Sequence, residues 1–372
     1  MHVMVDIQPA VGPGAGIGRY VRSLLGPLAA QRRPEDRLSL FYFDFRRRGV
    51  PPLPAGAEVR AHRWIPGRIV QRAWRTFRAP PFDWFSGPAD LFHFTNFVTR
   101  PLRRGRSVVS IHDASFLRHP ETLEPKNLAF LTRHIRRSVE TADAIITISR
   151  FTADELHALL DVPREKLHPI HLGLGEHLAP PSPDGITAAR KVLRLDRPYL
   201  LHVGTLEPRK NLTLLVDAFE RLDRADLDLV LAGKPGWHTG PILARIEASP
   251  LRDRIRRLDF VPEAHLAGLY GGASLYVCPT LYEGFGFTPL EAMRCGVPVV
   301  ASRSSCLPEV LGDAPVWVDG YDAGDWTDVL RQTLDDEAAQ AVARERGLAQ
   351  AAGYTWAATA AAHWDVYRKV LA

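Results

Sequence analysis

The sequence predicts an α/β protein with two Rossmann-like, doubly wound domains that face each other across a cleft. The chain has 372 residues, which at roughly 150 residues per domain exceeds one typical core and fits two domains. Short apolar runs alternate with amphipathic helical stretches, which is the signature of parallel α/β sheets. Residues 179–185 are rich in helix breakers, separate two such series, and are therefore expected to form a linker.

The first series predicts strands that alternate with helices. The expected strands are His2–Ile7, Leu38–Phe43, Leu91–Phe94, Ser107–Ile111 and Ala144–Ile148. A helix around Tyr20–Leu25 follows the opening strand, and another follows the last strand with the capping pattern Thr152-x-x-Glu155 at its start.

The second series repeats this alternation after the linker. Its expected strands are Tyr199–Val203, Leu227–Ala232, Leu275–Cys278 and Pro298–Ala301, with helices over Asn211–Leu222 and Pro289–Arg294. The chain ends in an expected helix from Trp356 to Leu371, which needs a surface to cover.

Composition indicates a soluble, globular, cytoplasmic protein. The chain is 46% hydrophobic and 24% charged, and no apolar run reaches the roughly 18 to 20 residues that span a bilayer. The first residues lack the charged flank and apolar stretch of a signal peptide. Cys278, Cys295 and Cys306 are odd in number and show no metal-ligand spacing, so we expect reduced thiols and no disulfides.

The formal net charge of +5 reflects an arginine excess concentrated early in the chain. Aromatic and aliphatic residues, Trp64, Trp74 and Phe77 among them, are interleaved with these arginines. The arginines are Arg46, Arg47, Arg48, Arg60, Arg63, Arg68, Arg72, Arg75 and Arg78. Such a segment can lie on an anionic membrane surface, bind nucleic acid, or form a solvated helix face. No nucleic-acid motif supports the second alternative.

Ligands of doubly wound sheets bind beyond the carboxyl ends of the strands, so the loops at those ends are the candidate sites. The glycine-rich loop Gly12–Arg19 follows the first strand, and its glycines allow close backbone approach to a phosphate or a sugar. It fails the dinucleotide fingerprint, because Arg19 stands where the last glycine is needed, and a flexible turn remains an alternative. His112 ends another apolar strand, where it is either structural or functional; Asp113 could orient its imidazole, although adjacent strand residues point to opposite faces.

Two loops of the second series carry charge. Arg209 and Lys210 lie between a strand and a helix and suit a diphosphate leaving group, the alternative being a solvated basic turn. The spacing of Glu283 and Glu291 suits a sugar nucleotide bound at both ends, with Glu283 at the hydroxyls beyond the phosphates and Glu291 towards the ribose. Thr288-x-x-Glu291 matches a capping box with Pro289 at the first helical position, so Glu291 also has an explanation as a helix cap.

We expect no essential metal. Asp226-x-Asp228 could suggest a metal-bound sugar nucleotide, but it precedes an expected strand and is better explained as a turn. Arg209, Lys210 and the helix N-terminus after Thr288 would supply the positive charge that a metal provides elsewhere.

These segments together resemble glycosyltransferase family 4, whose members are retaining enzymes with the GT-B architecture. The resemblance covers nearly the whole chain, and the last two of its motifs together are highly specific. The motifs are Gly16-Ile17-Gly18-Arg19-Tyr20, Val109–Asp113, Ile146–Thr152, Val203–Asn211, and the E-x7-E element from Glu283 to Glu291. Many members have arginine where Thr205 stands, so the diphosphate role is expected to rest more heavily on Arg209 and Lys210.

The resemblance implies roles for individual residues. His112 and Glu283 would be the catalytic residues: His112 would line the reaction centre near the transferred sugar, and Glu283 would bind sugar hydroxyls. The donor site would further comprise Gly16, Arg209, Lys210, Gly284, Phe285, Gly286, Phe287, Thr288 and Glu291, the last on the ribose hydroxyls. The resemblance also implies an acceptor-binding domain over 1–178, a donor-binding domain over 186–356, and a terminal helix over 357–372 that crosses back onto the first domain.

The resemblance further implies transfer of a hexose from a nucleoside diphosphate sugar. The anomeric configuration of the sugar is retained, and no cofactor is needed. Within the family, the motifs resemble those of mannosyl- and rhamnosyltransferases of surface polysaccharide synthesis, so we expect GDP-mannose as the donor. The expected acceptor is a saccharide or a polyprenyl-linked saccharide at the inner face of the membrane. Two alternatives remain: a sugar-nucleotide epimerase of the same architecture, and a binding protein with a degenerate site.

Overall fold

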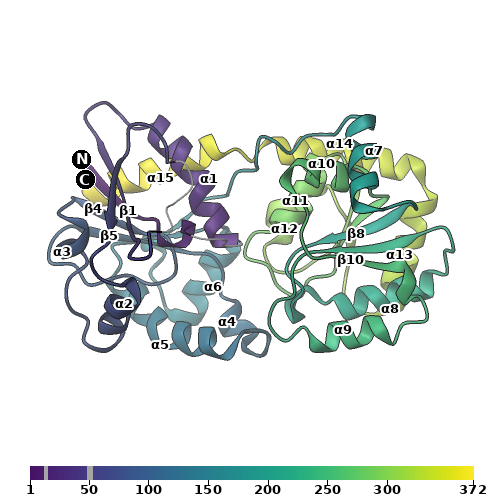
Figure 1. The fold of residues 1–372 in the computed structure, drawn as a ribbon, viewed down its shortest axis with the longest axis horizontal. Coiled ribbons are helices and arrows are strands. Elements are labelled where there is room, and N and C mark those ends of the chain that lie inside the picture. Colours follow the sequence, from purple (N-terminus) through teal and green to yellow (C-terminus); the bar gives the residue numbers. More distant parts are fainter. Residues whose placement is uncertain (12–15, 48–52) are drawn as a thin grey trace. The chain divides into compact units, whose positions relative to one another are not determined.

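The structure, a computed structural model, describes residues 1–11, 16–47 and 53–372 (Figure 1). The chain divides into two compact units. The N-terminal unit consists of residues 1–117, 127–173 and 355–372, and the C-terminal unit consists of residues 118–126 and 174–354.

The N-terminal unit is built on a seven-stranded parallel sheet with the strand order β3-β2-β1-β4-β5-β6-β7. The strands are β1 (His2–Asp6), β2 (Arg37–Phe43), β3 (Glu58–His62), β4 (Leu91–Phe94), β5 (Arg106–Ile111), β6 (Ala144–Thr147) and β7 (Leu167–Pro169). The order reverses between β1 and β4, so the loops after these strands flank the switch point of a doubly wound sheet.

Helices cover both sides of this sheet: α1 and α15 lie on one side, and α2, α5 and α6 on the other (Figure 1). The helices are α1 (Gly16–Ala30), α2 (Gly67–Thr76), α3 (Asp83–Ser86), α4 (Ser115–Arg118), α5 (Pro125–Thr141), α6 (Arg150–Leu160) and α15 (Trp356–Leu371). Short 3-10 turns cover Gln8–Ala10 and Arg164–Lys166, and a third, Pro120–Thr122, belongs to the C-terminal unit. Helix α15 packs against α1, and its buried Trp364 donates a hydrogen bond from Nε1 to the Leu28 carbonyl oxygen (2.9 Å).

The C-terminal unit carries a six-stranded parallel sheet with the order β10-β9-β8-β11-β12-β13. The strands are β8 (Tyr199–Val203), β9 (Asp228–Ala232), β10 (Ile255–Leu258), β11 (Leu275–Cys278), β12 (Val299–Ser302) and β13 (Val316–Val318). Its switch point lies between β8 and β11, which brings the loops after these two strands together.

The helices of this unit enclose an aliphatic core. They are α7 (Pro183–Leu193), α8 (Leu212–Leu222), α9 (Gly240–Glu247), α10 (Glu263–Gly271), α11 (Phe287–Arg294), α12 (Leu307–Leu311), α13 (Ala323–Asp335) and α14 (Glu337–Ala352), with 3-10 turns over Pro208–Lys210 and Arg252–Arg254. Phe219 of α8 and Trp326 of α13 join strand residues such as Leu229 and Val277 in one buried cluster. Each large apolar side chain buried there contributes about 1.5 to 3 kcal/mol.

The predicted fold class is confirmed, and the expected strands β4, β8 and β11 have the predicted bounds. Strands β3, β7, β10 and β13 were missed, and each of them is an edge strand of its sheet. The three cysteines are buried free thiols.

Three local predictions were wrong. Ser149, not Thr152, caps α6, because the Ser149 Oγ accepts a hydrogen bond from the Thr152 N–H (3.1 Å). The expected linker is partly helical, since Ser182 caps α7 and Pro183 is its first residue. Helix α11 begins at Phe287 with Gly286 as its N-cap, so the capping box at Thr288 does not form.

Candidate functional site

A compact group of charged side chains lies at the switch point of the C-terminal sheet. Lys210 and Arg209 come from the loop after β8, and Glu283 comes from the loop after β11. The Lys210 Nζ donates a short hydrogen bond to Glu283 Oε1, and Arg209 Nη1 lies 3.3 Å from Glu283 Oε2. The sequence-predicted cations and the first of the paired glutamates therefore converge.

Arg209 is held in place by further contacts. Its Nη2 lies 2.6 Å from Glu207 Oε1, and its Nη1 donates to the Tyr282 carbonyl oxygen at 2.8 Å. Glu207 is buried and was not predicted as a site residue. The two cations thus face two carboxylates in a largely buried group, where each charge has a partner of opposite sign.

The charge state of Glu283 follows from its neighbours. Burial by itself would raise the pKa of Glu283, but the positive charges of Lys210 and Arg209 outweigh burial and hold that pKa below its usual value. The carboxylate is therefore ionised at neutral pH. The Glu283 backbone N–H donates to Ser305 Oγ (2.9 Å), which fixes the loop that carries it.

His202, at the end of β8, is a buried member of this group that sequence reasoning missed. Its Nδ1 lies 2.9 Å from the Val277 carbonyl oxygen, so Nδ1 carries the proton and Nε2 is an acceptor. Nε2 is buried and makes no hydrogen bond with the described residues. A Cβ placed on Gly204 would lie 3.4 Å from this nitrogen and 3.9 Å from Lys210 Nζ. Burial and the charge of Lys210 lower the pKa of His202 to about 4.

The loop from Glu283 to helix α11 carries a buried phenylalanine and a glycine in the left-handed region of φ. Phe285 is buried, with its ring 5.1 Å from Phe287 and 5.8 Å from Tyr354. Gly286 has a φ of +88°, and a Cβ there would come within 2.6 Å of the Leu307 side chain. Glycine is thus required at the N-cap of α11.

Glu291 and Thr288 have different surroundings from those that the capping box implied. Glu291 is buried beyond the first turn of α11, and its Oε2 accepts a hydrogen bond from the Tyr270 hydroxyl (2.9 Å). Thr288 Oγ1 accepts from the Tyr276 hydroxyl (2.7 Å), and the Tyr276 ring stacks on His202 at 6.1 Å. The explanation of Glu291 as a helix cap is therefore wrong.

In the N-terminal unit, His112 follows β5 and is buried against aromatic rings. Its ring lies 5.0 Å from Tyr20 and 5.5 Å from Phe97. His112 Nε2 lies 2.9 Å from the Thr95 carbonyl oxygen, so Nε2 carries the proton and Nδ1 is the acceptor. Burial lowers the pKa of His112 despite the opposing effects of Thr95 and Asp113, so the imidazole is neutral at neutral pH.

Asp113 and the glycine-rich loop are the other predicted residues of the N-terminal unit. Asp113 Oδ1 accepts hydrogen bonds from the N–H and the hydroxyl of Ser115 (3.0 and 2.7 Å), so its carboxylate is engaged at the start of α4. Gly16 is exposed at the start of α1, whereas residues 12–15 of the predicted loop lie outside the described residues. A Cβ at Gly18 would lie 2.8 Å from the Pro9 carbonyl oxygen, so this glycine is required by a close backbone approach.

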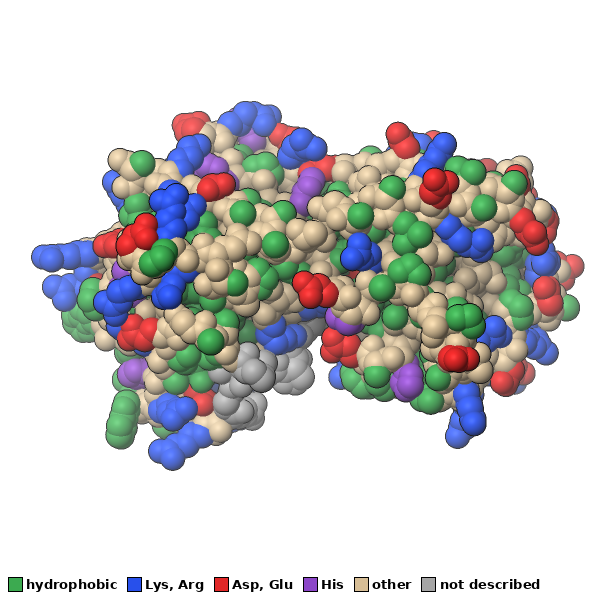
Figure 2. Space-filling model, turned by 90° about the horizontal axis from the view of Figure 1, so that it is seen from above, with side chains coloured by type: hydrophobic (Ala, Val, Ile, Leu, Met, Phe, Trp, Pro, Cys, Tyr) green, Lys and Arg blue, Asp and Glu red, His purple; other side chains and the backbone are tan. Residues whose placement is uncertain are grey.

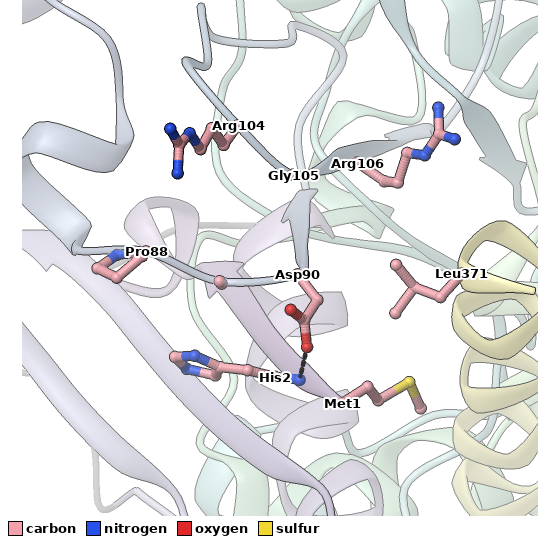
Figure 3. A pocket seen from close by; sticks show the side chains of 9 residues that line it. Met1, His2, Pro88, Asp90, Arg104, Gly105, Arg106 and Leu371 are labelled. Atoms are coloured by element: carbon pink, nitrogen blue, oxygen red, sulfur yellow. Dashed lines mark hydrogen bonds between the residues drawn. The ribbon is translucent and has the colours of Figure 1, made fainter.

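One hollow of the N-terminal unit, about 920 Å³ in volume, is lined by residues such as His2, Asp90, Arg104 and Arg106 (Figure 3). The His2 N–H donates to Asp90 (2.7 Å), and the two arginines extend in opposite directions. The hollow lies at the amino ends of the strands, whereas ligands of such sheets bind at the carboxyl ends. It is therefore not part of the predicted site.

No group of three or more His, Cys, Asp and Glu side chains within residues 1–11, 16–47 and 53–372 is placed to hold a metal ion. Asp226, from the Asp226-x-Asp228 sequence, instead contacts Arg224 at 3.2 Å, and Asp228 is the buried first residue of β9.

Comparison with known proteins agrees with this architecture. Residues 14–175 match the family model "Glycosyltransferase Family 4", and residues 186–350 match "Glycosyl transferases group 1". The chain is similar to the O-antigen chain mannosyltransferase B of Escherichia coli, with 31% identity over 96% of each chain. Among solved structures it resembles the sucrose-phosphate synthase of Thermosynechococcus elongatus (TM-score 0.75, 21% identity, 99% and 98% coverage). It also resembles WaaG, a glycosyltransferase of lipopolysaccharide biosynthesis (TM-score 0.72, 16% identity, 98% and 99% coverage).

Two Rossmann-like units of this kind define the GT-B class of glycosyltransferases. The chain belongs to glycosyltransferase family 4, as its motifs indicated. It is accordingly a glycosyltransferase, and nothing in these comparisons supports the epimerase alternative.

Proposed function

We propose that this protein is a retaining hexosyltransferase of surface polysaccharide synthesis that uses GDP-mannose as its donor. The acceptor is a saccharide or a lipid-linked saccharide, and the reaction needs no metal. The observation that carries the proposal is the convergence of Lys210, Arg209 and Glu283 at the switch point of the C-terminal sheet. Similarity to an O-antigen mannosyltransferase supports the choice of mannose.

The paired charges suggest how the donor binds. The diphosphate takes the place of carboxylate oxygens around Lys210 and Arg209, because a guanidinium fork and an ammonium both suit phosphate oxygens. Glu283, released from these cations, accepts hydrogen bonds from hydroxyls of the sugar. The backbone N–H groups of Gly284 to Thr288 add further donors, and Glu291 holds the ribose hydroxyls.

Chemistry then proceeds by front-face substitution. The bond between the anomeric carbon and the diphosphate oxygen breaks, and the acceptor oxygen bonds to the same face of the sugar. The acceptor proton passes to the departing phosphate oxygen. Lys210 and Arg209 stabilise the charge that develops on the leaving group, which in a preorganised site is the largest single contribution to catalysis. His112, neutral and buried, lines the sugar-binding end with its Nδ1 lone pair.

The domain roles are part of the same proposal. Residues 186–356 bind the donor and residues 1–178, with the terminal helix, bind the acceptor. Gly16 opens α1 beside the first strand and offers its backbone to the donor diphosphate.

We also propose that the protein works at the inner face of the plasma membrane, as a cytoplasmic protein in peripheral contact with anionic lipid. Among the described residues, no helix has both the length and the apolar character to cross a bilayer. The support is the surface around α2, where Trp64 is 87% exposed, Phe77 77% and Ile69 61%. Arginines lie between them in the sequence. On the face seen from above, Lys and Arg side chains project from the N-terminal unit with hydrophobic side chains exposed among them (Figure 2). Val70 and Trp74 of helix α2 are buried, so the helix packs on the unit with one side and exposes the other.

A thermal-shift screen tests the donor assignment. GDP-mannose at about 100 times its dissociation constant adds roughly 2.7 kcal/mol of stability. We expect GDP and GDP-mannose to raise the melting temperature more than UDP, ADP and their sugars, and EDTA to leave the shift unchanged. A preference for another nucleotide would overturn the choice of GDP-mannose, and product without an added acceptor would favour epimerisation.

A further inference from the structure

A second cavity of the N-terminal unit, about 350 Å³ in volume, is lined by three arginines. Arg78 follows α2, Arg100 lies in the loop after β4, and Arg137 lies on α5. We call it the arginine cavity. Trp74 of α2 and Phe130 of α5 provide apolar parts of its wall, so that charge and hydrophobic surface occur together.

The walls of the arginine cavity are fixed by hydrogen bonds. Trp74 Nε1 donates to the Pro80 carbonyl oxygen (2.6 Å), and the Arg100 guanidinium lies 5.2 Å over the Trp74 ring. The Thr99 N–H donates to Ser138 Oγ (3.1 Å), which ties the loop after β4 to α5. Phe130, His134 and Arg137 recur at the helical period and share one face of α5. These contacts fix the part of the wall formed by Trp74, Thr99 and Arg100, while the Arg78 and Arg137 side chains are exposed.

Nearby acids balance only part of its charge, because Arg100 interacts electrostatically with the buried Asp6. Asp143 is the one carboxylate of the lining, and it is engaged by Arg106 (2.9 Å) and by the Ser107 N–H (2.7 Å). Among the described residues, no carboxylate lies within salt-bridge distance of Arg78 or Arg137. A cavity with this excess of guanidinium groups favours an anion with several oxygens, and phosphate geometry matches the arginine fork.

The position of the cavity identifies the source of the phosphate. Arg78 directly follows the exposed Phe77, and α2 carries the exposed Ile69, Arg68 and Arg72. Glu58, the one acidic residue between positions 45 and 78, is paired with Arg37 and Arg60 (3.0 and 2.9 Å). An anionic bilayer complements this surface, since exposed aromatic rings enter the headgroup region and arginines pair with lipid phosphates.

We propose that the arginine cavity binds the terminal phosphate group of an anionic membrane lipid. This inference rests on the membrane contact of the proposed function, but not on the identity of the donor sugar. A phosphomonoester carries about −1.5 to −2 charges at neutral pH, so it gains more from Arg78 and Arg137 than a phosphodiester does. The protein therefore prefers vesicles that contain phosphatidic acid over vesicles with phosphatidylglycerol at matched total charge.

Vesicle flotation with the full chain tests the proposal. The variant R78Q/R137Q removes two cavity arginines, and R133Q/R136Q removes two exposed arginines from other positions of the same helix, α5. Each arginine paired with a lipid at the surface is worth about fivefold in partitioning. We expect R78Q/R137Q to lower partitioning onto phosphatidic acid vesicles by about 30-fold and to lose the lipid preference. R133Q/R136Q should retain the preference.

The outcomes separate the two proposals. If the wild-type protein floats with neither vesicle at low salt, the membrane contact itself is wrong. If it floats but R78Q/R137Q keeps the wild-type preference, the membrane contact stands and the assignment of the cavity is overturned. A thermal-shift measurement with inorganic phosphate distinguishes a lipid phosphate from free phosphate as the ligand of the cavity. A cavity-dependent melting shift with inorganic phosphate, together with equal binding to both vesicles, would show a site for free phosphate and would overturn the lipid assignment. Nucleotide thermal shifts on the same variants check that the donor-binding unit is intact.

Discussion

The Tyr20 hydroxyl lies 2.9 Å from His363 Nε2, although the two residues are 343 positions apart in the chain. Both are buried, Tyr20 in α1 and His363 in α15. His363 Nδ1 lies 2.7 Å from the Thr359 carbonyl oxygen and must donate its proton there, so Nε2 accepts from Tyr20. The terminal helix is thereby fastened to the N-terminal unit by a polar contact of defined direction.

The contact belongs to a longer chain of hydrogen bonds. Tyr20 lies 3.0 Å from Ser110 Oγ, which lies 2.8 Å from His93 Nε2, and His93 Nδ1 lies 2.7 Å from the Tyr367 hydroxyl. His363 can only accept from Tyr20, and this fixes the direction of every other hydrogen bond in the series. Tyr367 donates to His93, His93 donates to Ser110, and Ser110 donates to Tyr20. Both histidines must then be neutral.

Removing the Tyr20 hydroxyl should loosen this contact. We expect Tyr20→Phe to reduce the free energy of unfolding by about 1 to 3 kcal/mol, because Ser110 and His363 lose a buried partner. Urea denaturation followed by circular dichroism measures the change. Tyr321→Phe, at a residue that is 41% exposed, is the matched control and should cost much less. Equal losses in the two variants would argue against the buried chain.

The free energy of unfolding should decrease as the pH is lowered below about 6.5, at pH values still above those where carboxylates titrate. The folded-state pKa of His363 is lowered by burial to about 4, as is that of His202 by burial and Lys210, from an unfolded value near 6.5. Below about pH 6.5 the unfolded chain binds protons that the folded chain excludes, so stability decreases as pH falls towards 4. Each histidine should cost about 2 kcal/mol between about pH 6.5 and 5. Urea midpoints at several pH values measure this, and a flat profile above pH 5 would contradict it.

Lys210 should matter for turnover more than for donor affinity. We expect Lys210→Ala to lower kcat by about 10² to 10³, the scale for losing one preorganised group that stabilises transition-state charge. Lys234→Ala, which removes an ammonium lying over the Phe260 ring in the same unit, is the control and should leave kcat near the wild-type value. A rise in KM with kcat unchanged would assign Lys210 to ground-state binding only.

Replacing Glu283 should strengthen the binding of free GDP but weaken catalysis with GDP-mannose. In Glu283→Gln the side chain keeps its shape but no longer competes with phosphate for Lys210 and Arg209. We expect GDP to bind several-fold more tightly, while kcat/KM with GDP-mannose falls by about 10² because a charged acceptor for sugar hydroxyls is lost. Calorimetry and initial rates measure the two quantities. Parallel losses in both would show that Glu283 serves only to hold the loop.

The interior of both sheets could be predicted from the sequence because central strands are buried on both faces and appear as apolar runs. Strands β4 (LFHF), β8 (YLLHV) and β11 (LYVC) show this. The edge strands could not be predicted. In β3 (EVRAH) and β10 (IRRL) one side is open to solvent, so charged residues break the pattern that identifies a strand.

The site was partly predictable for a related reason. The loops that carry Lys210 and Glu283 follow apolar strands and are rich in charge and glycine, so they stand out. That β8 and β11 are neighbours depends on sheet order, which no local pattern contains. His202 was missed because a histidine inside an apolar strand gives no separate signal. The capping boxes at Thr152 and Thr288 failed because Ser149 and Gly286 lie closer to the true helix starts.

The central claim is that Lys210, Arg209 and Glu283 form the diphosphate end of a donor site. A crystal structure of the protein with GDP-mannose tests it most directly. The claim predicts diphosphate oxygens within hydrogen-bond distance, about 2.7 to 3.2 Å, of Lys210 Nζ and the Arg209 guanidinium, with sugar hydroxyls on Glu283. A nucleotide bound elsewhere, with the Lys210–Glu283 pair intact and buried, would contradict it.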